Sequence, residues 1–389
     1  MKKKAVVIGG GFAGVQAAIE LSKKNIFEVT LISDRDYLYM YPISIWIPTG
    51  KLDFDDARVS LSRISDAFGF ELIIDPVLKI SSAENKVFCQ NHILEYDYLV
   101  AAMGAHKVKH PGIENTLSIC GKPEISLEIR ERLNSLIEKG EGKIAVGFGG
   151  NPKDKSAVRG GPAFELLFNI HRLLEEKNMR RKFELTFFAP MKEPGERMGR
   201  NSLKLVDRMF KDLDIKKHYG VKITAFEAAG VAFEDGSKVE SDLTIFIPAS
   251  AGHSVLKDSD LSLSEAGFIK IDDNCLAEGT NNVYAAGDIA ALEGPDWKAK
   301  QGHTAEVMAR CAAENIYNSE KGLPERKGYK EHLSILCIMD TGNGAAFVYR
   351  DDKKQFAIPM PILGHWMKKG WGIYAKAVKT GRFPRIPGL

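Results

Sequence analysis

Three glycines near the start of the chain, Gly9, Gly11 and Gly14, have the spacing of a turn that binds the pyrophosphate of a dinucleotide. In such a turn the first glycine makes the bend, the second lets the phosphates approach the backbone, and the third lets a helix pack closely on a strand. The helix amides then face the phosphates with the positive end of the helix dipole. The sequence therefore predicts a dinucleotide site here, and a purely structural glycine turn is the alternative.

A second pair of residues with chemical meaning, Gly287 and Asp288, follows the apolar stretch 282–286 and is predicted to lie at the start of a helix. A glycine lets a phosphate come close, and a carboxylate can accept a hydrogen bond from a ribityl hydroxyl. Lys300 and Gly302 then precede a predicted helix, whose N-terminus would stabilise negative charge on a reduced flavin ring. Two such features at opposite ends of one chain favour FAD over an ordinary strand–turn–helix crossing.

A parallel sheet must bring these two ends together. The apolar runs 5–8 and 28–33 predict its first two strands, and Ser33 or Asp34 at the end of the second can bind a ribose hydroxyl. Short strands are also predicted at the segments 70–74, 86–89, 96–101, 267–272 and 282–286. Gly104, at a strand-to-loop crossing, and Pro42, in a tyrosine-rich loop, are further cofactor-site residues in this prediction.

A second unit is predicted between residues 114 and 250. A helix over 126–139 and a strand over 143–146 lead into four residues, 147–150, that resemble a second glycine turn. The polar insertion Asn151–Arg159 interrupts that turn, and the next strand ends in Ala189-Pro190 without an acid for a nicotinamide ribose. The unit is therefore predicted to be Rossmann-shaped but a poor site for NAD(P)H.

Composition limits the classes of function. With 389 residues and 44% hydrophobic content, the chain has room for two domains and a small third one, and its net charge of +3 gives no case for nucleic acid. The five cysteines form no C-x-x-C pair, and no histidine has metal-ligand spacing, so no metal is predicted. The first strand starts directly after the N-terminal lysines, and no run of 18 apolar residues occurs, so neither a signal peptide nor a transmembrane helix is expected.

The C-terminal segment 362–379 has the pattern of an amphipathic helix. Its apolar residues fall in one arc and its four lysines on the opposite side. The segment from Pro359 to Leu389 has six Lys or Arg and no Asp or Glu. This pattern predicts a helix that lies on an anionic membrane surface. An ordinary helix packed on the protein with a solvated basic face is the alternative.

Taken together, these motifs resemble those of the sulfide:quinone oxidoreductases, flavoproteins with two dinucleotide-binding domains and FAD. Besides the two ends already described, the resemblance rests on the loop with Pro42, Trp46 and Gly50; on Ser118-Ile119-Cys120; on Gly161-Pro162-Ala163-Phe164-Glu165; on Cys337 before Asp340–Phe347; and on Gly364-His365-Trp366 to Tyr374. It extends over nearly the whole chain. It implies an α/β fold in which 1–113 and 251–330 bind FAD, 114–250 form a degenerate NAD-type domain, and 331–389 cap the flavin and face the membrane.

The resemblance also implies site residues. Cys337 stands where the family has a redox cysteine near the flavin, Cys120 matches another cysteine segment, and Phe347 and Trp371 stand at quinone positions. The family usually has a second redox cysteine two residues before the central Gly-Pro, and here Arg159 stands there. We expect Arg159 to attract an anionic donor and to lower the pKa of Cys337. Without a second cysteine, sulfur should leave on an external acceptor.

The resemblance implies transfer of two electrons from sulfide, or another reduced sulfur donor, through FAD to a quinone. The alternatives are a type II NADH dehydrogenase, a flavocytochrome-type sulfide dehydrogenase subunit, and an FAD-binding interaction subunit without chemistry. We expect a peripheral protein of the cytoplasmic membrane, with a cytoplasmic location as the alternative. The sequence leaves the oligomeric state open, a homo-oligomer included.

Overall fold

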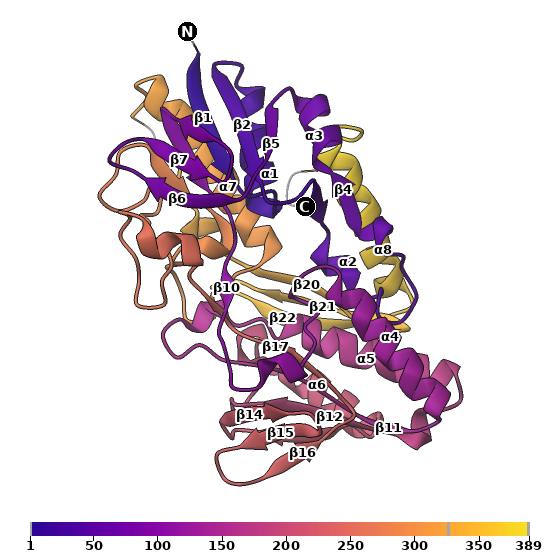
Figure 1. Cartoon of the computed structure of the whole chain (residues 1–389). Helices are drawn as coiled ribbons and strands as arrows, with labels where there is room; N and C mark the ends of the chain where they lie inside the picture. The colour runs from indigo at the N-terminus through magenta and orange to yellow at the C-terminus, as the bar shows by residue number, and fades with distance from the viewer. Residues whose placement is uncertain (1, 325–326, 387–389) are drawn as a thin grey trace.

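The first of two parallel sheets contains both predicted ends of the cofactor site (Figure 1). The computed structural model describes residues 2–324 and 327–386. The sheet has the order β19-β9-β1-β2-β5, and all its neighbours are parallel. Its strands are β1 (Lys3–Ile8), β2 (Phe27–Ser33), β5 (Glu71–Ile74), β9 (Tyr98–Ala101) and β19 (Val283–Ala285). The strand order reverses between β1 and β9, and ligands of such sheets bind beyond the carboxyl ends of the strands at that point.

A second parallel sheet, of order β13-β12-β11-β17, forms the lower part of the molecule in Figure 1. Its strands are β11 (Gly142–Phe148), β12 (Phe183–Ala189), β13 (Lys216–Tyr219) and β17 (Leu243–Ile247). Helix α5 (Gly161–Glu176) connects β11 to β12, and most of its residues are buried. The α/β fold with two Rossmann-like sheets is therefore confirmed, while the exact domain boundaries stay a prediction.

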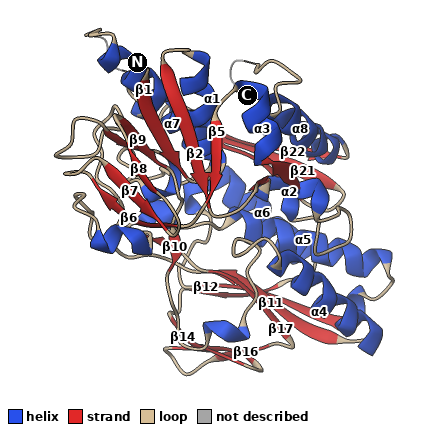
Figure 2. Cartoon of the chain, turned by 45° about the horizontal axis from the view of Figure 1, so that its top comes forward, coloured by secondary structure: helices blue, strands red, loops and turns tan. Residues whose placement is uncertain are grey.

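A third, antiparallel sheet lies between the two parallel ones in Figure 1, and the last helix packs on it (Figure 2). It consists of β20 (Ile335–Asp340), β21 (Gly344–Arg350) and β22 (Gln355–Pro361), and it is followed by α8 (Leu363–Lys379). Helix α5 also contacts β20. These contacts bring the C-terminal part of the chain to the space between the parallel sheets.

The remaining elements cover the sheets or form small ones. The other helices are α1 (Phe12–Lys23), α2 (Tyr41–Ser44), α3 (Leu61–Phe68), α4 (Ile125–Lys139), α6 (Arg200–Asp212) and α7 (Gly302–Glu320). The small sheets are β3 (Tyr37–Tyr39) with β4 (Arg58–Ser60); β6 (Val77–Ser81), β7 (Lys86–Cys89) and β8 (Ile93–Glu95); β10 (His106–Lys107) with β18 (Ser250–Ala251); and β14 (Ile223–Glu227), β15 (Gly230–Phe233) and β16 (Lys238–Glu240). Helices α1 and α7 pack on each other beside the first sheet.

Two local predictions were wrong. The segment 267–272 forms only isolated bridges, because Gly267 has a φ of +81° and the Asp272 carboxylate folds the next residues into a tight turn. Gly287 and Asp288 begin a short 3-10 turn, and α7 starts only at Gly302. The N-terminus of a long helix therefore lies at Gly302, as predicted, but not at Asp288.

Candidate functional site

A cleft of about 1910 Å³ opens at the strand-order reversal of the first sheet, between that sheet, the second sheet and β20–β21. Pockets for one small ligand usually measure about 300–1,000 Å³, so this cleft has room for a large cofactor and a substrate. Apart from Gly14, every predicted site residue lines it. These are Gly9, Gly11, Ser33, Asp34, Pro42, Gly104, Cys120, Arg159, Gly287, Asp288, Lys300, Gly302, Cys337, Phe347 and Trp371.

The first glycine turn has the geometry that a pyrophosphate needs. Gly9 has a φ of +115°, and a side chain there would lie 2.4 Å from the carbonyl oxygen of Ala102. A Cβ on Gly14 would lie 1.8 Å from the Gly9 oxygen, so Gly14 serves the packing of α1 on β1 behind the cleft. Gly11 has no atom within 4 Å of its Cβ position and leaves the N-terminus of α1 open to the cleft. These residues fit a dinucleotide phosphate at a helix N-terminus.

Ser33 and Asp34, the two residues predicted to bind a ribose hydroxyl at the end of β2, have different surroundings in the structure. The Ser33 hydroxyl donates to the Arg35 carbonyl at 2.7 Å and is buried, so it closes its own turn. Asp34 is exposed on the cleft wall, where a ribose hydroxyl can reach it. The Nε of Arg35 is buried and has no hydrogen-bond partner among the described residues, which fits a ligand at this end of the cleft.

Gly287 and Asp288 lie opposite the first turn. Gly287 has a φ of +80°, and a Cβ there would lie 3.1 Å from the Ala13 side chain, so glycine is required. Lys300 donates from Nζ to the Asp288 carbonyl at 3.1 Å and lies 3.8 Å from the ring centre of Phe268. Burial lowers the pKa of Lys300 to about 8. Lys300 therefore holds the backbone of this turn through its ammonium group.

Arg159 does not act on Cys337 as the sequence predicted. Its guanidinium forms an ion pair with the carboxylate of Asp288, which raises the pKa of Arg159, and Cys120 lies beside it. Burial raises the pKa of Cys337 to about 12, and the neighbouring charges are Glu165, which raises it further, and Lys368, which lowers it. The predicted lowering of the Cys337 pKa was wrong, because the charge of Arg159 is directed to Asp288 and burial disfavours the thiolate.

Cys120 also favours the protonated thiol. It is buried in the cleft wall, and burial raises its pKa, although Lys107 and Arg159 act in the opposite direction. Three cationic side chains, Lys107, Arg159 and Lys300, thus surround the carboxylate of Asp288, and Asp154 also acts on Lys300. This part of the cleft is suited to negatively charged groups.

Comparison with known proteins agrees with this geometry. Residues 3–310 match the family described as "Pyridine nucleotide-disulphide oxidoreductase". A sulfide-quinone reductase of Aquifex aeolicus (strain VF5) is 30% identical over 377 residues, which covers 90% of this chain and 84% of the relative. The chain belongs to the pyridine nucleotide-disulphide oxidoreductase family. It is an FAD-dependent oxidoreductase that resembles sulfide-quinone reductases.

The crystal structure of the sulfide:quinone oxidoreductase from Aquifex aeolicus superimposes with a TM-score of 0.87 at 27% identity and covers 97% of this chain and 92% of that one. A type II NADH:quinone oxidoreductase of Staphylococcus epidermidis is 22% identical over 410 residues, which covers 98% of this chain and 99% of the relative. The similarity to the family therefore includes the C-terminal sheet and α8, beyond the residues that the family description matches.

One ion pair in the cleft of this family member was missed by the sequence analysis. Lys368 of α8 donates to Glu165 of α5 at 2.5 Å, and both side chains are buried and line the cleft near Cys337. Burial raises the pKa of Glu165, and Lys368 opposes that shift. A usable signal was present, since Glu165 interrupts an otherwise apolar stretch of a buried helix and buried acids are usually paired.

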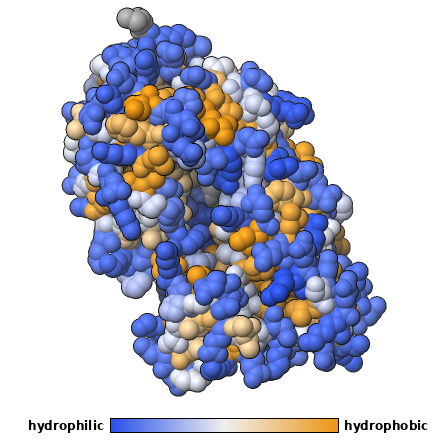
Figure 3. Space-filling model, in the orientation of Figure 1, coloured by the Kyte–Doolittle hydropathy of each residue, from blue (hydrophilic) through white to orange (hydrophobic). Residues whose placement is uncertain are grey.

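Helix α8 is oriented differently from the prediction. Lys368 and Lys379 were expected on its solvated side, but both are buried, and Lys379 pairs with Glu306 of α7 at 2.7 Å. The outer surface instead has large apolar side chains, among them Trp366, 63% exposed, and Ile373, 72% exposed. Hydrophobic side chains are visible on the side of the molecule where α8 lies (Figure 3). Within residues 2–324 and 327–386, no helix has the length and apolar character needed to cross a membrane.

Proposed function

We propose that this oxidoreductase passes two electrons from a reduced sulfur species to a membrane quinone. The observation that supports this most directly is that one cleft brings together the dinucleotide turn at Gly9–Gly11, the thiol of Cys337 and the ion pair Glu165–Lys368. A dinucleotide cofactor, a sulfur nucleophile and a group that can exchange protons are the three requirements of such a reaction.

The residues of the first sheet fit FAD. Gly11 and the N-terminus of α1 would face the pyrophosphate, Asp34 the ribose, and Asp288 a ribityl hydroxyl. When bound, FAD supplies the capacity to accept two electrons and release them again. Arg159 and Lys300 hold Asp288 and its backbone in place, so the carboxylate is fixed before the cofactor arrives.

On the donor side, Cys337 is the thiol that contacts sulfur, and Glu165 beside it is the group that can take its proton. The cations around Asp288 attract an anion such as hydrosulfide. With Arg159 in place of a second cysteine, the sulfur leaves on an external thiolate: HS⁻ and RS⁻ give RSS⁻, one proton and two electrons. The quinone takes up those two electrons and two protons.

On the acceptor side, Phe347 and Trp371 line the cleft next to the exposed apolar residues of α8. A quinone is an apolar molecule dissolved in the bilayer, so the access path to its site should open toward lipid. We therefore assign the outer surface of α8 to an anionic membrane, with Lys369 and Lys376 as the cations near it. Peripheral binding through this surface would let quinone enter without crossing water.

NADH is the second donor to consider, because a type II NADH:quinone oxidoreductase matches along the whole chain. The glycine turn that follows β11 does not favour binding of NADH. The Asn151 side chain donates to the Ser250 carbonyl at 2.8 Å and accepts from the Lys153 amide at 3.0 Å, so the start of the insertion forms a turn that is held to β18. Strand β12 ends at Ala189 without an acid for the ribose.

The test is an anaerobic titration of the purified, FAD-loaded protein with sulfide, with sulfide plus a thiol, and with NADH, followed by flavin absorbance. We expect bleaching by sulfide, faster with the thiol present, and reoxidation by a soluble quinone. Bleaching by NADH alone would contradict the proposed donor, and a protein that takes up no FAD would contradict the whole proposal.

A further inference from the structure

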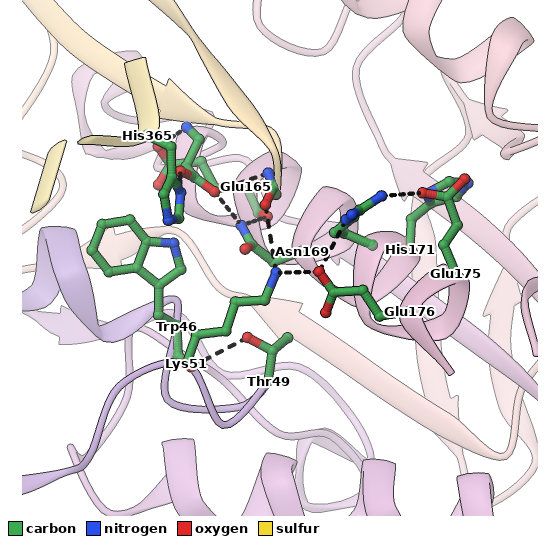
Figure 4. Close-up of polar contacts among 12 residues, drawn as sticks. Trp46, Thr49, Lys51, Glu165, Asn169, His171, Glu175, Glu176 and His365 are labelled. Carbon is green, nitrogen blue, oxygen red and sulfur yellow. Dashed lines mark hydrogen bonds and ion pairs between the residues drawn. The ribbon is translucent and has the colours of Figure 1, made fainter. Parts of the chain in front are cut away.

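Three buried ionisable side chains, Glu165, Asp340 and Lys368, form a connected cluster at the cleft wall with the partly exposed His365. Glu165 and His365 are labelled in Figure 4. Glu165 and Lys368 form its front, at the cleft. Asp340, fully buried on β20, and His365 on α8 form its back: the His365 Nδ1 lies 2.7 Å from an Asp340 carboxylate oxygen. The two pairs are directly linked, because the Asp340 backbone amide donates to the Glu165 carboxylate at 3.0 Å.

The charges of this cluster do not balance without an additional proton. Two carboxylates face one ammonium group, so a net negative charge would be buried, and isolated buried charge is costly. His365 contributes the imidazole of the four side chains, a group that can be neutral or protonated, and its ring is 16% exposed. One proton, on His365 or on Glu165, makes the cluster neutral.

We propose that these four side chains share one movable proton, which the Glu165–Lys368 pair gives to the cleft and His365 replaces from solvent. The inference rests on the proposed function, since reduction of a quinone consumes two protons. It assigns Asp340 and His365 as positioning residues that act through Glu165.

Within the part of the chain that the structure describes, the charged groups around the cluster do not supply the missing positive charge. At the rim, Lys51 and Arg172 pair with Glu176, at 3.4 and 3.0 Å, and Arg172 also contacts Glu175. Lys369 lies over the rings of Trp46 and Trp366, outside the cluster. In the cleft, the neighbour of Glu165 is the thiol of Cys337, whose high pKa keeps it neutral. The two cations at the rim, Lys51 and Arg172, are thus paired with the acids Glu175 and Glu176.

Two atoms beside the back pair are suited to an ordered water. The indole N–H of Trp46 and the Oδ1 of Asn169 are buried and have no hydrogen-bond partner among the described residues. The Trp46 ring is centred 5.1 Å from that of His365, and the Asn169 amide donates to Asp340 at 2.9 Å. A donor and an acceptor of this kind are commonly satisfied by internal water, which also conducts protons.

The first test is a pH titration of the histidine ring resonances by NMR, with the His365 signal assigned by its loss in His365→Gln. An opposite charge within about 4–6 Å shifts a titration by about 1–3 units. Asp340→Asn should lower the midpoint of His365 by that amount, and Glu165→Gln should lower it by less. If Glu165→Gln leaves the midpoint unchanged, the two pairs do not share a proton and His365 only anchors α8.

A second variant keeps the test valid if Glu165→Gln fails to fold. His365→Gln retains a hydrogen bond to Asp340 but cannot hold a proton, so Glu165 should be protonated at neutral pH. The infrared carbonyl band of a protonated carboxyl group should appear in His365→Gln and be weaker in wild type at pH 6. Identical spectra would overturn the proposal. His171→Gln is the matched control, because this buried histidine of α5 points away from Trp46 and His365 (Figure 4).

A kinetic measurement separates this inference from the proposed function. In the FAD-loaded protein, His365→Gln should change the pH profile of quinone reduction, whereas His171→Gln should not. An unchanged profile would remove His365 from the proton path. A protein that shares the proton by NMR but reduces no quinone would leave the cluster in place and refute the proposed function alone.

Discussion

The strongest test of the chemistry assigned to the cleft concerns the reactivity of Cys337. Burial disfavours the charged thiolate and raises its pKa to about 12, so at pH 8 only ~10⁻⁴ of the side chain would be ionised, against about a quarter of a free cysteine with a pKa near 8.5. Alkylation should therefore be roughly 10³-fold slower than for a free thiol. Replacing Glu165 by Gln removes the acid that raises this pKa and leaves Lys368, which lowers it. A change of about one pKa unit or more should accelerate alkylation at least ~10-fold.

The assay is the rate of iodoacetamide labelling at pH 8, resolved by peptide mass mapping so that each cysteine is followed separately. Cys89 is an internal reference, because burial raises its pKa to about 11 and the charge that acts on it is Asp75, not Glu165. Glu176→Gln, on the same helix but at the rim, is the matched control and should leave the rate unchanged. Labelling of wild-type Cys337 as fast as a free thiol, or no acceleration in Glu165→Gln, would refute the reasoning.

Three further predictions use the FAD-loaded protein. Cys337→Ala should abolish flavin bleaching by sulfide, while Arg159→Ala should mainly raise the sulfide concentration needed; equal bleaching by Cys337→Ala and wild type would exclude Cys337 from the reaction. NADH at micromolar concentration should reduce the flavin far more slowly than the ~10 s⁻¹ of a typical enzyme, as measured by stopped flow. Replacing Trp366 and Ile373 by Ser should weaken binding to anionic liposomes, with Ile93→Ser, on an exposed strand elsewhere, as the control; unchanged co-sedimentation would show that the exposed residues of α8 do not contact lipid.

The first sheet and both glycine-containing ends of the cofactor site could be predicted because each depends on local signals. Strand β1 is a short apolar run that is buried on both faces, and the requirement for glycine at Gly9 and Gly287 comes from their own positive φ and close neighbours. The segment 267–272 shows the limit of this approach. Its apolar residues are buried, but a turn formed by Asp272 prevents a continuous ladder, and periodicity contains no information on that turn.

The charges of the site could not be predicted, because they depend on residues far apart in the sequence. Arg159 was placed beside Cys337 by sequence resemblance, and the structure pairs it with Asp288, 129 positions away. Lys368 was placed on the solvated side of an ideal amphipathic helix, and it pairs with Glu165, 203 positions away. A helical projection treats every lysine as solvated, whereas a buried acid on a neighbouring helix can bind one on the inner face.

This inner face determines how the membrane surface of α8 can be tested. Its two buried lysines neutralise Glu165 and Glu306, and removing one partner of a buried pair costs about 3–5 kcal/mol. Deleting the segment after Pro359 would remove both lysines, which leaves Glu165 without its partner and Glu306 with Arg310 at 3.8 Å. The loss of several kcal/mol is large against the ~5–15 kcal/mol that stabilises a typical domain. Such a truncated protein would lose membrane binding because it unfolds, whether or not α8 contacts lipid. Substitutions limited to the exposed residues Trp366 and Ile373 leave both ion pairs intact, so only they separate a membrane contact from a structural one.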